Sequence, residues 1–303
     1  MRCLAGLALS LLCAVGVARA EAPEVKNVVS GRRALEHVRA LTQVGARVPG
    51  TQGHTWAQAY IIRHLRLAYA DIEEVDFAAQ TPRGVVPMKN IIGRIAGRSD
   101  DIIVLAGHYD TLKLEGFVGA NDGGSSAALL LELARVLGRQ QPNDATIWVT
   151  FFDGEEAFER WGPRDGIYGS RYQASAWQRD ATLARIKAVI VVDMIGDRDL
   201  NVRLDSNSTP WLNELVLQVA RDRGHEAHFS EDERPVWDDH VPFVQAGVPA
   251  VDLIDFDYGP ENRYWHTPED TADKLSPRSF EIVADVVLEI VARLSQRWPT
   301  AEP

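Results

Sequence analysis

The residues best suited to chemistry are two adjacent carboxylates, Glu155 and Glu156, which follow an Asp153-Gly154 turn. The apolar run before that turn, Ile147 to Phe152, is typical of a buried strand, so both glutamates come at its carboxyl end. In an open α/β sheet, ligands bind at that edge. Neighbouring side chains leave a strand end in different directions, so one glutamate can hold a metal ion while the other acts as general acid/base. A solvated acidic turn is the alternative for such a pair taken alone.

Other carboxylates and imidazoles stand at similar places along the chain. His108 and Asp193 each follow an apolar run, Asp122 precedes a helix predicted for Ala127 to Leu137, and His266 lies in the loop before the last helix. Each of them alone has an ordinary explanation as a cap, a turn or a hydrogen-bonded side chain. Turns do not readily explain so many of them at strand ends or at an adjoining helix start.

Together these side chains make a set of nitrogen and oxygen ligands that zinc accepts. Three ligands suffice for one zinc ion, with a position left open for water or substrate, whereas five with a shared aspartate suit two ions. The set comprises His108, Asp122, Glu156, Asp193 and His266. If His108 binds metal, Asp110 is the expected partner that orients its ring.

The elements that must position this set alternate between apolar strands and amphipathic helices. This order predicts a single α/β domain with a mixed, mainly parallel central sheet flanked by helices. The expected strands are 72–77, 90–95, 102–106, 147–152, 188–192 and 250–254, and the main expected helices are 32–44, 55–69, 127–137, 210–223 and 277–297. Arg47 and His54 are expected to fix the first interhelical loop. Residues 224–234 are expected to form a polar loop that exposes His225 and His228.

The first 20 residues have the features of a secretory signal. A basic start is followed by an apolar run from Leu4 to Val17 and an Ala18-Arg19-Ala20 end, which predicts cleavage after Ala20 and a catalytic domain over 21–303. The run is short for a membrane span, so no membrane anchor is expected after cleavage. Both cysteines lie inside this leader, so the mature chain would have none. We expect a secreted or periplasmic protein.

Charge and composition restrict the kind of partner. The chain is 46% hydrophobic and 25% charged, enough apolar content for one large core. Its net charge is −11, and loss of the two arginines of the leader would make it −13. Nucleic acid and anionic membrane surfaces are poor partners for such a chain. A cation among carboxylates, or a cationic amine, suits it better.

Six motifs extend this interpretation to most of the mature chain. GHYDT, GANDGG, FFDGEEAF, VVDMIG, DDHVPF and YWHTPEDT, in this order, resemble the zinc aminopeptidase family that also contains the animal-type glutaminyl-peptide cyclotransferases. The cyclotransferase branch is favoured because VDFAAQTPRG, KNIIG, FVGA, GEEAFERW and WDDHVPF are similar to its segments. A Trp161-containing insertion also follows the glutamate pair, where aminopeptidases run almost directly to Gly-Ser.

The resemblance implies a role for each candidate residue. In the cyclotransferases, Asp122, Glu156 and His266 would hold one catalytic zinc ion, and Glu155 would be the proton shuttle. Asp193 and Asp238 would be hydrogen-bonded acid partners of Glu155, and Trp161 and Trp265 would wall the substrate pocket. In the two-zinc aminopeptidases, Asp122 would bridge the ions, and His108 and Asp193 would complete the second site.

The chain also departs from the cyclotransferase pattern. Glu261 stands in the region where those enzymes carry an aromatic residue shortly before the Trp-His pair, and Asp252 stands where the animal enzymes have a histidine. GANDGGSS is closer to the aminopeptidase form. These departures leave the metal number and the pocket details open.

Two enzymatic hypotheses follow. The first is a zinc-dependent cyclotransferase that converts N-terminal glutamine of peptides or proteins to pyroglutamate with loss of ammonia, acting as a monomer. Zinc would polarise the γ-amide carbonyl, and Glu155 would carry a proton from the attacking amine to the leaving ammonia. The second is a two-zinc aminopeptidase. A binding domain that has lost its chemistry would lack ligands, and none is missing.

Overall fold

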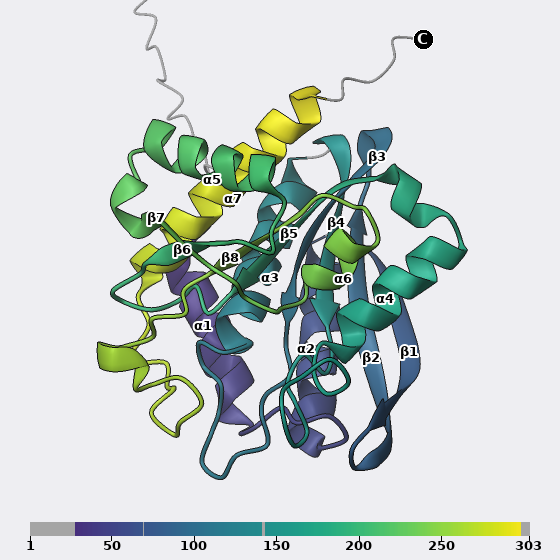
Figure 1. The fold of residues 1–303 in the computed structure, drawn as a ribbon, viewed down its shortest axis with the longest axis vertical. Helices are drawn as coiled ribbons and strands as arrows, with labels where there is room; N and C mark the ends of the chain where they lie inside the picture. The colour runs from purple at the N-terminus through teal and green to yellow at the C-terminus, as the bar shows by residue number, and fades with distance from the viewer. Residues whose placement is uncertain (1–27, 69, 141–142, 298–303) are drawn as a thin grey trace, which may run out of the picture.

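The protein is built around a mixed sheet of eight strands (Figure 1). The structure is a computed structural model, and it describes residues 28–68, 70–140 and 143–297. The strand order is β1-β2-β4-β3-β5-β8-β6-β7. Strands β3, β4, β5 and β8 run parallel, as do β6 and β7, whereas the pairs β1–β2, β2–β4 and β6–β8 are antiparallel. The predicted α/β fold with a mixed, mainly parallel sheet is confirmed. The predicted leader lies outside the described residues.

The strands at the centre of the sheet are rich in Val and Ile and are buried on both faces, as parallel strands are. Their bounds are β1 Asp71–Thr81, β2 Gly84–Ile95, β3 Gly97–His108, β4 Asn143–Phe152, β5 Ile186–Asp193, β6 Val202–Asp205, β7 Phe229–Arg234 and β8 Ala250–Ile254.

Helices cover both faces of this sheet. One layer is formed by α1 Gly31–Gln43, α2 Gln52–Leu67, α3 Gly124–Arg139, α5 Pro210–Asp222 and α7 Pro277–Arg297, and the other by α4 Tyr168–Arg179 and α6 Val241–Gln245. Short 3-10 turns occupy Thr182–Arg185, Glu226–His228 and Pro260–Asn262. None of the helices in the described part of the chain is both long and apolar enough for a bilayer crossing.

The carboxyl ends of the parallel strands meet at one edge of the sheet, at the bottom of Figure 1. His108 is the last residue of β3 and lies opposite Phe152 of β4 in the ladder. Asp193 closes β5 opposite Ile254 of β8. The sheet register therefore delivers the chemically capable residues of distant segments to one place.

The region 224–234 differs from its prediction. It contains the strand β7. His225 is buried, and its Nε2 lies 2.9 Å from a carboxylate oxygen of Asp285 on α7. A partner 60 positions along the chain is invisible in the local pattern of polar residues. The expectation of a polar loop with an exposed His225 is therefore wrong.

Arg47, between α1 and α2, ties together the two ends of the β3–α3 loop at the catalytic edge. Its side chain is fully buried and donates at 2.7 Å to the backbone carbonyls of Tyr109 and Gly119, and of Val118 between them in the chain. One end of this loop follows His108 and the other leads to Asp122. The prediction that Arg47 fixes its surroundings is confirmed, and the loop that its side chain holds connects two candidate metal ligands.

Replacement of Arg47 by lysine should therefore loosen the edge although the charge is kept. A lysine ammonium cannot span three carbonyls in a planar fork, so buried acceptors lose their donors. We expect Arg47→Lys to lower the free energy of unfolding by about 3 kcal/mol, measured by urea denaturation. The matched control, Arg39→Lys on the exposed face of α1, should change it by less than about 0.5 kcal/mol. Equal stabilities of the two variants would contradict this anchoring role.

Candidate active site

Asp110 holds the backbone of Glu155 and Glu156 in place. The carboxylate of Asp110 accepts the Glu155 N–H at 3.0 Å and the Glu156 N–H at 3.3 Å. The turn before them needs glycine at 154, where φ is 68° and a Cβ would lie 2.5 Å from the sulfur of Met88. The two side chains thus start from a fixed point and point to different neighbours.

Asp122 lies between two imidazoles. Its Oδ1 is 3.2 Å from Nε2 of His108, and its Oδ2 is 3.1 Å from Nε2 of His266. The chain passes close to His108 at Gly123, where φ is 72° and a Cβ would meet the imidazole Cε1 at 2.9 Å. A side chain at 123 is excluded by this contact, so glycine lets the backbone crowd the site.

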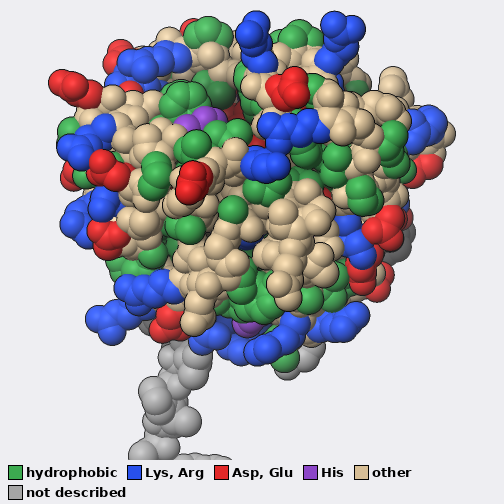
Figure 2. Space-filling view, turned by 90° about the horizontal axis from the view of Figure 1, so that it is seen from below, with side chains coloured by type: hydrophobic (Ala, Val, Ile, Leu, Met, Phe, Trp, Pro, Cys, Tyr) green, Lys and Arg blue, Asp and Glu red, His purple; other side chains and the backbone are tan. Residues whose placement is uncertain are grey.

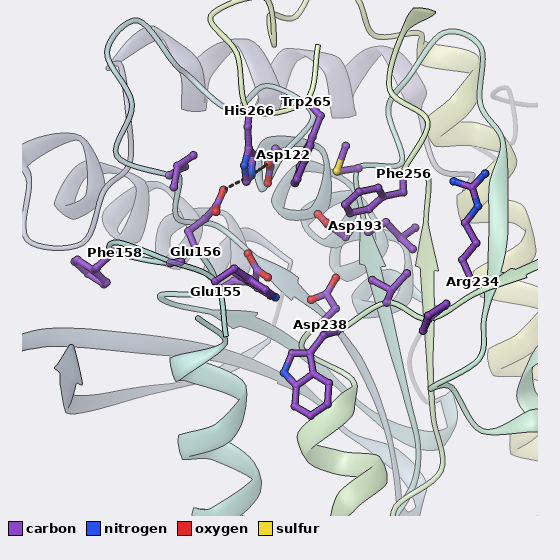
Figure 3. Close-up of a pocket in the computed structure, with 18 of the residues that line it drawn as sticks. Asp122, Glu155, Glu156, Phe158, Asp193, Arg234, Asp238, Phe256, Trp265 and His266 are labelled. Atoms are coloured by element: carbon purple, nitrogen blue, oxygen red, sulfur yellow. Dashed lines mark ion pairs between the residues drawn. The ribbon is translucent and has the colours of Figure 1, made fainter. Parts of the chain in front are cut away.

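Two groups of ligand atoms share this aspartate. In each of the groups, all three ligand atoms lie within 4.8 Å of one another. Glu156 joins the first group, with its Oε1 3.4 Å from His266 Nε2, and Asp193 joins the second, with its Oδ1 3.2 Å from His108 Nε2. The two groups are Asp122, Glu156 and His266, and His108, Asp122 and Asp193. Figure 3 shows Glu156 and Asp122 both pointing toward His266.

The donor atoms fit a metal ion. Glu156 Oε1 is buried and has no hydrogen-bond partner among the described residues, an expensive arrangement for a charged oxygen unless a cation completes it. Nitrogen and carboxylate oxygen are zinc ligands. Of the first group, His266 retains 28% exposure of its side chain and so faces the cavity, whereas His108 in the second retains 1%.

Backbone strain accompanies these ligands. His266 has a φ of 52°, and Met194, directly after Asp193, has a φ of 50°. Left-handed backbone costs a non-glycine residue free energy and persists where the surroundings enforce it, which is common at functional sites. Here, Asp270 helps to enforce the neighbouring loop, because its carboxylate accepts the backbone N–H of Asp122 at 3.1 Å.

The electrostatics of the acids reflect burial and crowding. Burial, together with the charges of Asp238 and Glu156, raises the pKa of Glu155 well above its usual value, against the opposing effect of His108. Burial and the nearby Asp193 raise the pKa of Asp238 to about 6. The raised pKa makes the Glu155 carboxylate a stronger proton acceptor than an ordinary glutamate, which suits a general acid/base.

A cavity of about 830 Å³ opens above these acids. Glu155, Asp193 and Asp238 lie on it, as do the predicted wall residues Trp161 and Trp265. It is more apolar than polar in its lining, with a few convergent charged groups, the usual character of a ligand site. The structure thus brings all the candidate site residues to one cavity or to its floor.

The indole of Trp265 is fixed between two rings. It stacks on His266 at 4.1 Å between centroids and contacts Phe256 at 5.0 Å. The sequence lacks an aromatic residue shortly before the Trp-His pair, and Phe256, which follows β8, places one against Trp265 instead (Figure 3). Sequence reasoning missed Phe256, and its place just beyond a strand end was the available signal.

The insertion that carries Trp161 is folded around Asp165. This carboxylate accepts the backbone N–H groups of Phe158, Glu159 and Arg160 at 2.8 to 2.9 Å. Trp161 is 42% exposed and packs over Gly166, where a Cβ would come within 2.8 Å of the indole. The loop thus presents one face of an aromatic ring to the cavity.

Asp110 has a different main role from the one predicted. Its Oδ1 lies 3.5 Å from His108 Nδ1, beyond a strong hydrogen bond, while its two oxygens accept the N–H groups of the glutamate pair.

Asp252, on β8, has no role in the sequence prediction beyond its departure from the cyclotransferase pattern. It is 1% exposed, and neither carboxylate oxygen has a hydrogen-bond partner among the described residues. Trp237, which also lines the cavity, was not singled out from the sequence.

The comparisons with known proteins agree with this geometry. The model of peptidase family M28 matches residues 90–291. The glutaminyl-peptide cyclotransferase of Drosophila melanogaster is 32% identical over 268 residues, covering 80% of this chain and 75% of that relative. The family match spans the strand ends and loops that carry the candidate site.

Solved structures extend the likeness to the whole fold. A glutaminyl cyclase from an Acidobacteriales bacterium is 41% identical with a TM-score of 0.86, covering 92% of this chain and 99% of its own. A Zn-dependent exopeptidase from Parabacteroides distasonis, at 23% identity, TM-score 0.78 and coverage of 87% and 98%, shares the fold. This chain belongs to peptidase family M28 and, within it, to the glutaminyl-peptide cyclotransferases.

Proposed function

We propose that this chain is a zinc-dependent glutaminyl-peptide cyclotransferase that converts N-terminal glutamine of peptides and proteins to pyroglutamate and releases ammonia. The observation that carries the proposal is the position of Glu155. It lines the same cavity as the three residues of a zinc-type ligand group, and Trp161 and Trp265 line that cavity as well. A closing ring needs rigid walls that fold the glutamine side chain back toward its own amine, and indole rings supply them at little entropic cost.

Asp122, Glu156 and His266 would hold the catalytic zinc ion. When bound there, zinc supplies Lewis acidity toward a carbonyl oxygen. We assign the ion to this group because His266 is partly exposed to the cavity, whereas His108 is buried and its Nε2 lies 3.2 Å from Asp193. One ion is our assignment, with His108 and Asp193 as the ligands of any second.

Glu155 moves the proton in this reaction. The α-amine of the substrate attacks the γ-amide carbon, a C–N bond forms, and the amine proton passes to a Glu155 carboxylate oxygen. The same proton then goes to the amide nitrogen, whose bond to carbon breaks as ammonia leaves. No external nucleophile is consumed. Asp238 contributes negative charge that raises the pKa of Glu155, and Asp193 does the same for Asp238.

A two-zinc aminopeptidase is the second candidate. It is favoured by one observation, the completeness of the second ligand group of His108, Asp122 and Asp193. In that reaction Glu155 would activate water for hydrolysis of the first peptide bond. The cyclotransferase remains the proposal because the insertion that carries Trp161 encloses the cavity, and hydrolysis needs no such fold-back.

We further propose secretion or periplasmic export of a monomer, with cleavage after Ala20. The basis is the leader pattern of residues 1–20 and the location of both cysteines inside it. Amino-terminal sequencing of the exported protein should begin at Glu21. A mature protein that still starts at Met1 would contradict the assignment.

The most general prediction separates ring closure from hydrolysis. With a Gln-initiated peptide, the purified protein should yield a product lighter by one ammonia, with the peptide chain intact, as seen by mass spectrometry together with an ammonia assay. A Leu-initiated peptide of otherwise identical sequence should remain unchanged. Free leucine from the second peptide, with the first one uncyclised, would replace the cyclotransferase by the aminopeptidase.

Glu155→Gln should separate catalysis from folding. The amide keeps the shape but cannot carry the proton, so kcat should fall by roughly 10² to 10⁴, with zinc content unchanged. Glu36→Gln, exposed on α1 and outside the cavity lining, is the matched control and should retain kcat. Normal turnover of Glu155→Gln would mean that another acid shuttles the proton.

The zinc ligands should behave differently from the shuttle. His266→Ala and Glu156→Gln each remove one of three ligands, and an open site loses most of its affinity with one ligand gone. Elemental analysis after dialysis should show zinc loss in both variants. His228→Ala, outside the site, serves as control. Full zinc occupancy in the ligand variants would contradict the assignment.

Trp161 can be tested without removing it. Gly166→Ala introduces a methyl group within 2.8 Å of the indole and at a φ of 120°, so the ring must move. Both Gly166→Ala and Trp161→Ala should raise KM and lower kcat for cyclisation, while zinc content stays unchanged. Gly224→Ala, at a φ of 72° with nothing within 4 Å, controls for backbone strain alone. If Gly166→Ala matches this control in activity, the indole is not part of the substrate pocket.

A further inference from the structure

The outer wall of the cavity carries charge of the opposite sign to its floor. Four basic side chains line it, and Glu159 is the only exposed acid among the described lining residues. The basic residues are Arg83, Lys113, Arg203 and Arg234. Figure 2 views the molecule from the side of the strand ends, and basic side chains are spread across this face. A protein of net charge −11 thus surrounds its acidic site with cations.

Two of these four cations are already neutralised. Arg203 lies 3.1 Å from a carboxylate oxygen of Asp232 and also pairs with Asp257, and Arg234 lies 3.6 Å from Asp257. These arginines have carboxylate partners within the protein, so they have less need of one from a ligand.

Arg83 and Lys113 differ from that pair. Both are exposed, and neither side chain makes a hydrogen bond or ion pair with any residue in the described ranges 28–68, 70–140 and 143–297. They come from two segments, the β1–β2 hairpin tip and the loop after β3, yet line the same cavity. Two unpaired cations that line one cavity favour an anion there.

Exposed apolar side chains accompany both cations. Val85, two residues after Arg83, is 60% exposed, and Leu114, next to Lys113, is 38% exposed. Each lies close in the chain to a residue that lines the cavity, so some apolar surface accompanies both cations. The combination of apolar surface and unpaired positive charge fits a peptide with an acidic residue, and not a free inorganic anion.

The hairpin sets the distance of this surface from the reacting residue. Lys89 of β2 is level with the catalytic turn, because its N–H donates to Asp153 at 2.7 Å. Arg83 lies six residues earlier, about 20 Å along a strand. An extended peptide advances about 3.5 Å per residue. When the N-terminal glutamine of a peptide lies at Glu155, roughly the fourth to sixth residues after it therefore reach Arg83.

We propose that Arg83 and Lys113 form a subsite for a carboxylate carried by the substrate several residues after its N-terminal glutamine. The subsite rests on the proposed cyclotransferase function and deepens it by naming a substrate class, peptides with an acidic segment. It acts by charge attraction, which lowers KM and leaves the ring-closing step alone. The carboxylate comes from an Asp or Glu side chain or from the end of a short peptide.

The test compares C-terminally amidated Gln-initiated heptapeptides that carry Glu, Gln or Lys at positions five to seven. In low salt, kcat/KM should be on the order of fivefold higher for the Glu peptide than for the Lys peptide, through KM. The preference should shrink at high ionic strength, because salt screens exposed charges. The double variant Arg83→Glu/Lys113→Glu should reverse the order, whereas Arg63→Glu/Arg66→Glu, on α2 and outside the cavity, should preserve it.

Each outcome decides. If the C-terminal carboxylate of a peptide can fill the subsite, a neutral peptide with a free C-terminus should have a higher kcat/KM than its amide of the same length. If only acidic side chains raise kcat/KM, the subsite recognises acidic residues. Equal kcat/KM for the Glu and Lys peptides overturns the subsite while cyclisation itself stands. A preference abolished by Arg234→Glu and kept in the double variant places the anion at Arg234 and also overturns the proposed subsite. No cyclisation of any peptide refutes the proposed function instead.

Discussion

The structure depends on keeping like charges together in a buried place. Asp122, Glu156 and Asp193 are each at most 6% exposed, yet they lie close enough to share two imidazoles. Buried carboxylates are costly unless they are paired, hydrogen-bonded or bound to metal. The two histidines on either side of Asp122 offset part of the free-energy cost of burying these carboxylates. A zinc ion bound among the ligands would offset much of the rest. This requirement accounts for the rigid loops around the floor of the cavity.

The scaffold meets the requirement by bringing strand ends into register and locking the loops that leave them. His108 and Asp193 end neighbouring parallel strands, so the sheet itself fixes their separation. Arg47 then binds both ends of the loop that runs from His108 to Asp122. The insertion with Trp161 lines the cavity and supplies none of the residues of the two ligand groups. The ligands and this part of the cavity lining therefore come from different parts of the fold.

The sequence predicts those features that depend on neighbours in the chain. The ligands could be found because each follows an apolar run or precedes a helix, and the sheet class followed from the alternation of elements. Strand β7 could not, because its exposed positions are almost all charged. Contacts between distant segments were equally hidden: His225 with Asp285 of α7, and Phe256 with the ring of Trp265. The roles of the site residues follow from the family resemblance more than from their spacing.

The central claim is that one carboxylate, Asp122, organises a zinc site with Glu156 and His266 at the floor of the cavity. Anomalous X-ray scattering on either side of the zinc absorption edge, from crystals of the active protein, tests it directly. The account predicts an edge-dependent peak within bonding distance of Asp122, Glu156 and His266, about 2 Å from each ligand atom. A peak confined to His108 and Asp193, or no peak in crystals whose dissolved protein still cyclises a Gln-initiated peptide, would contradict it.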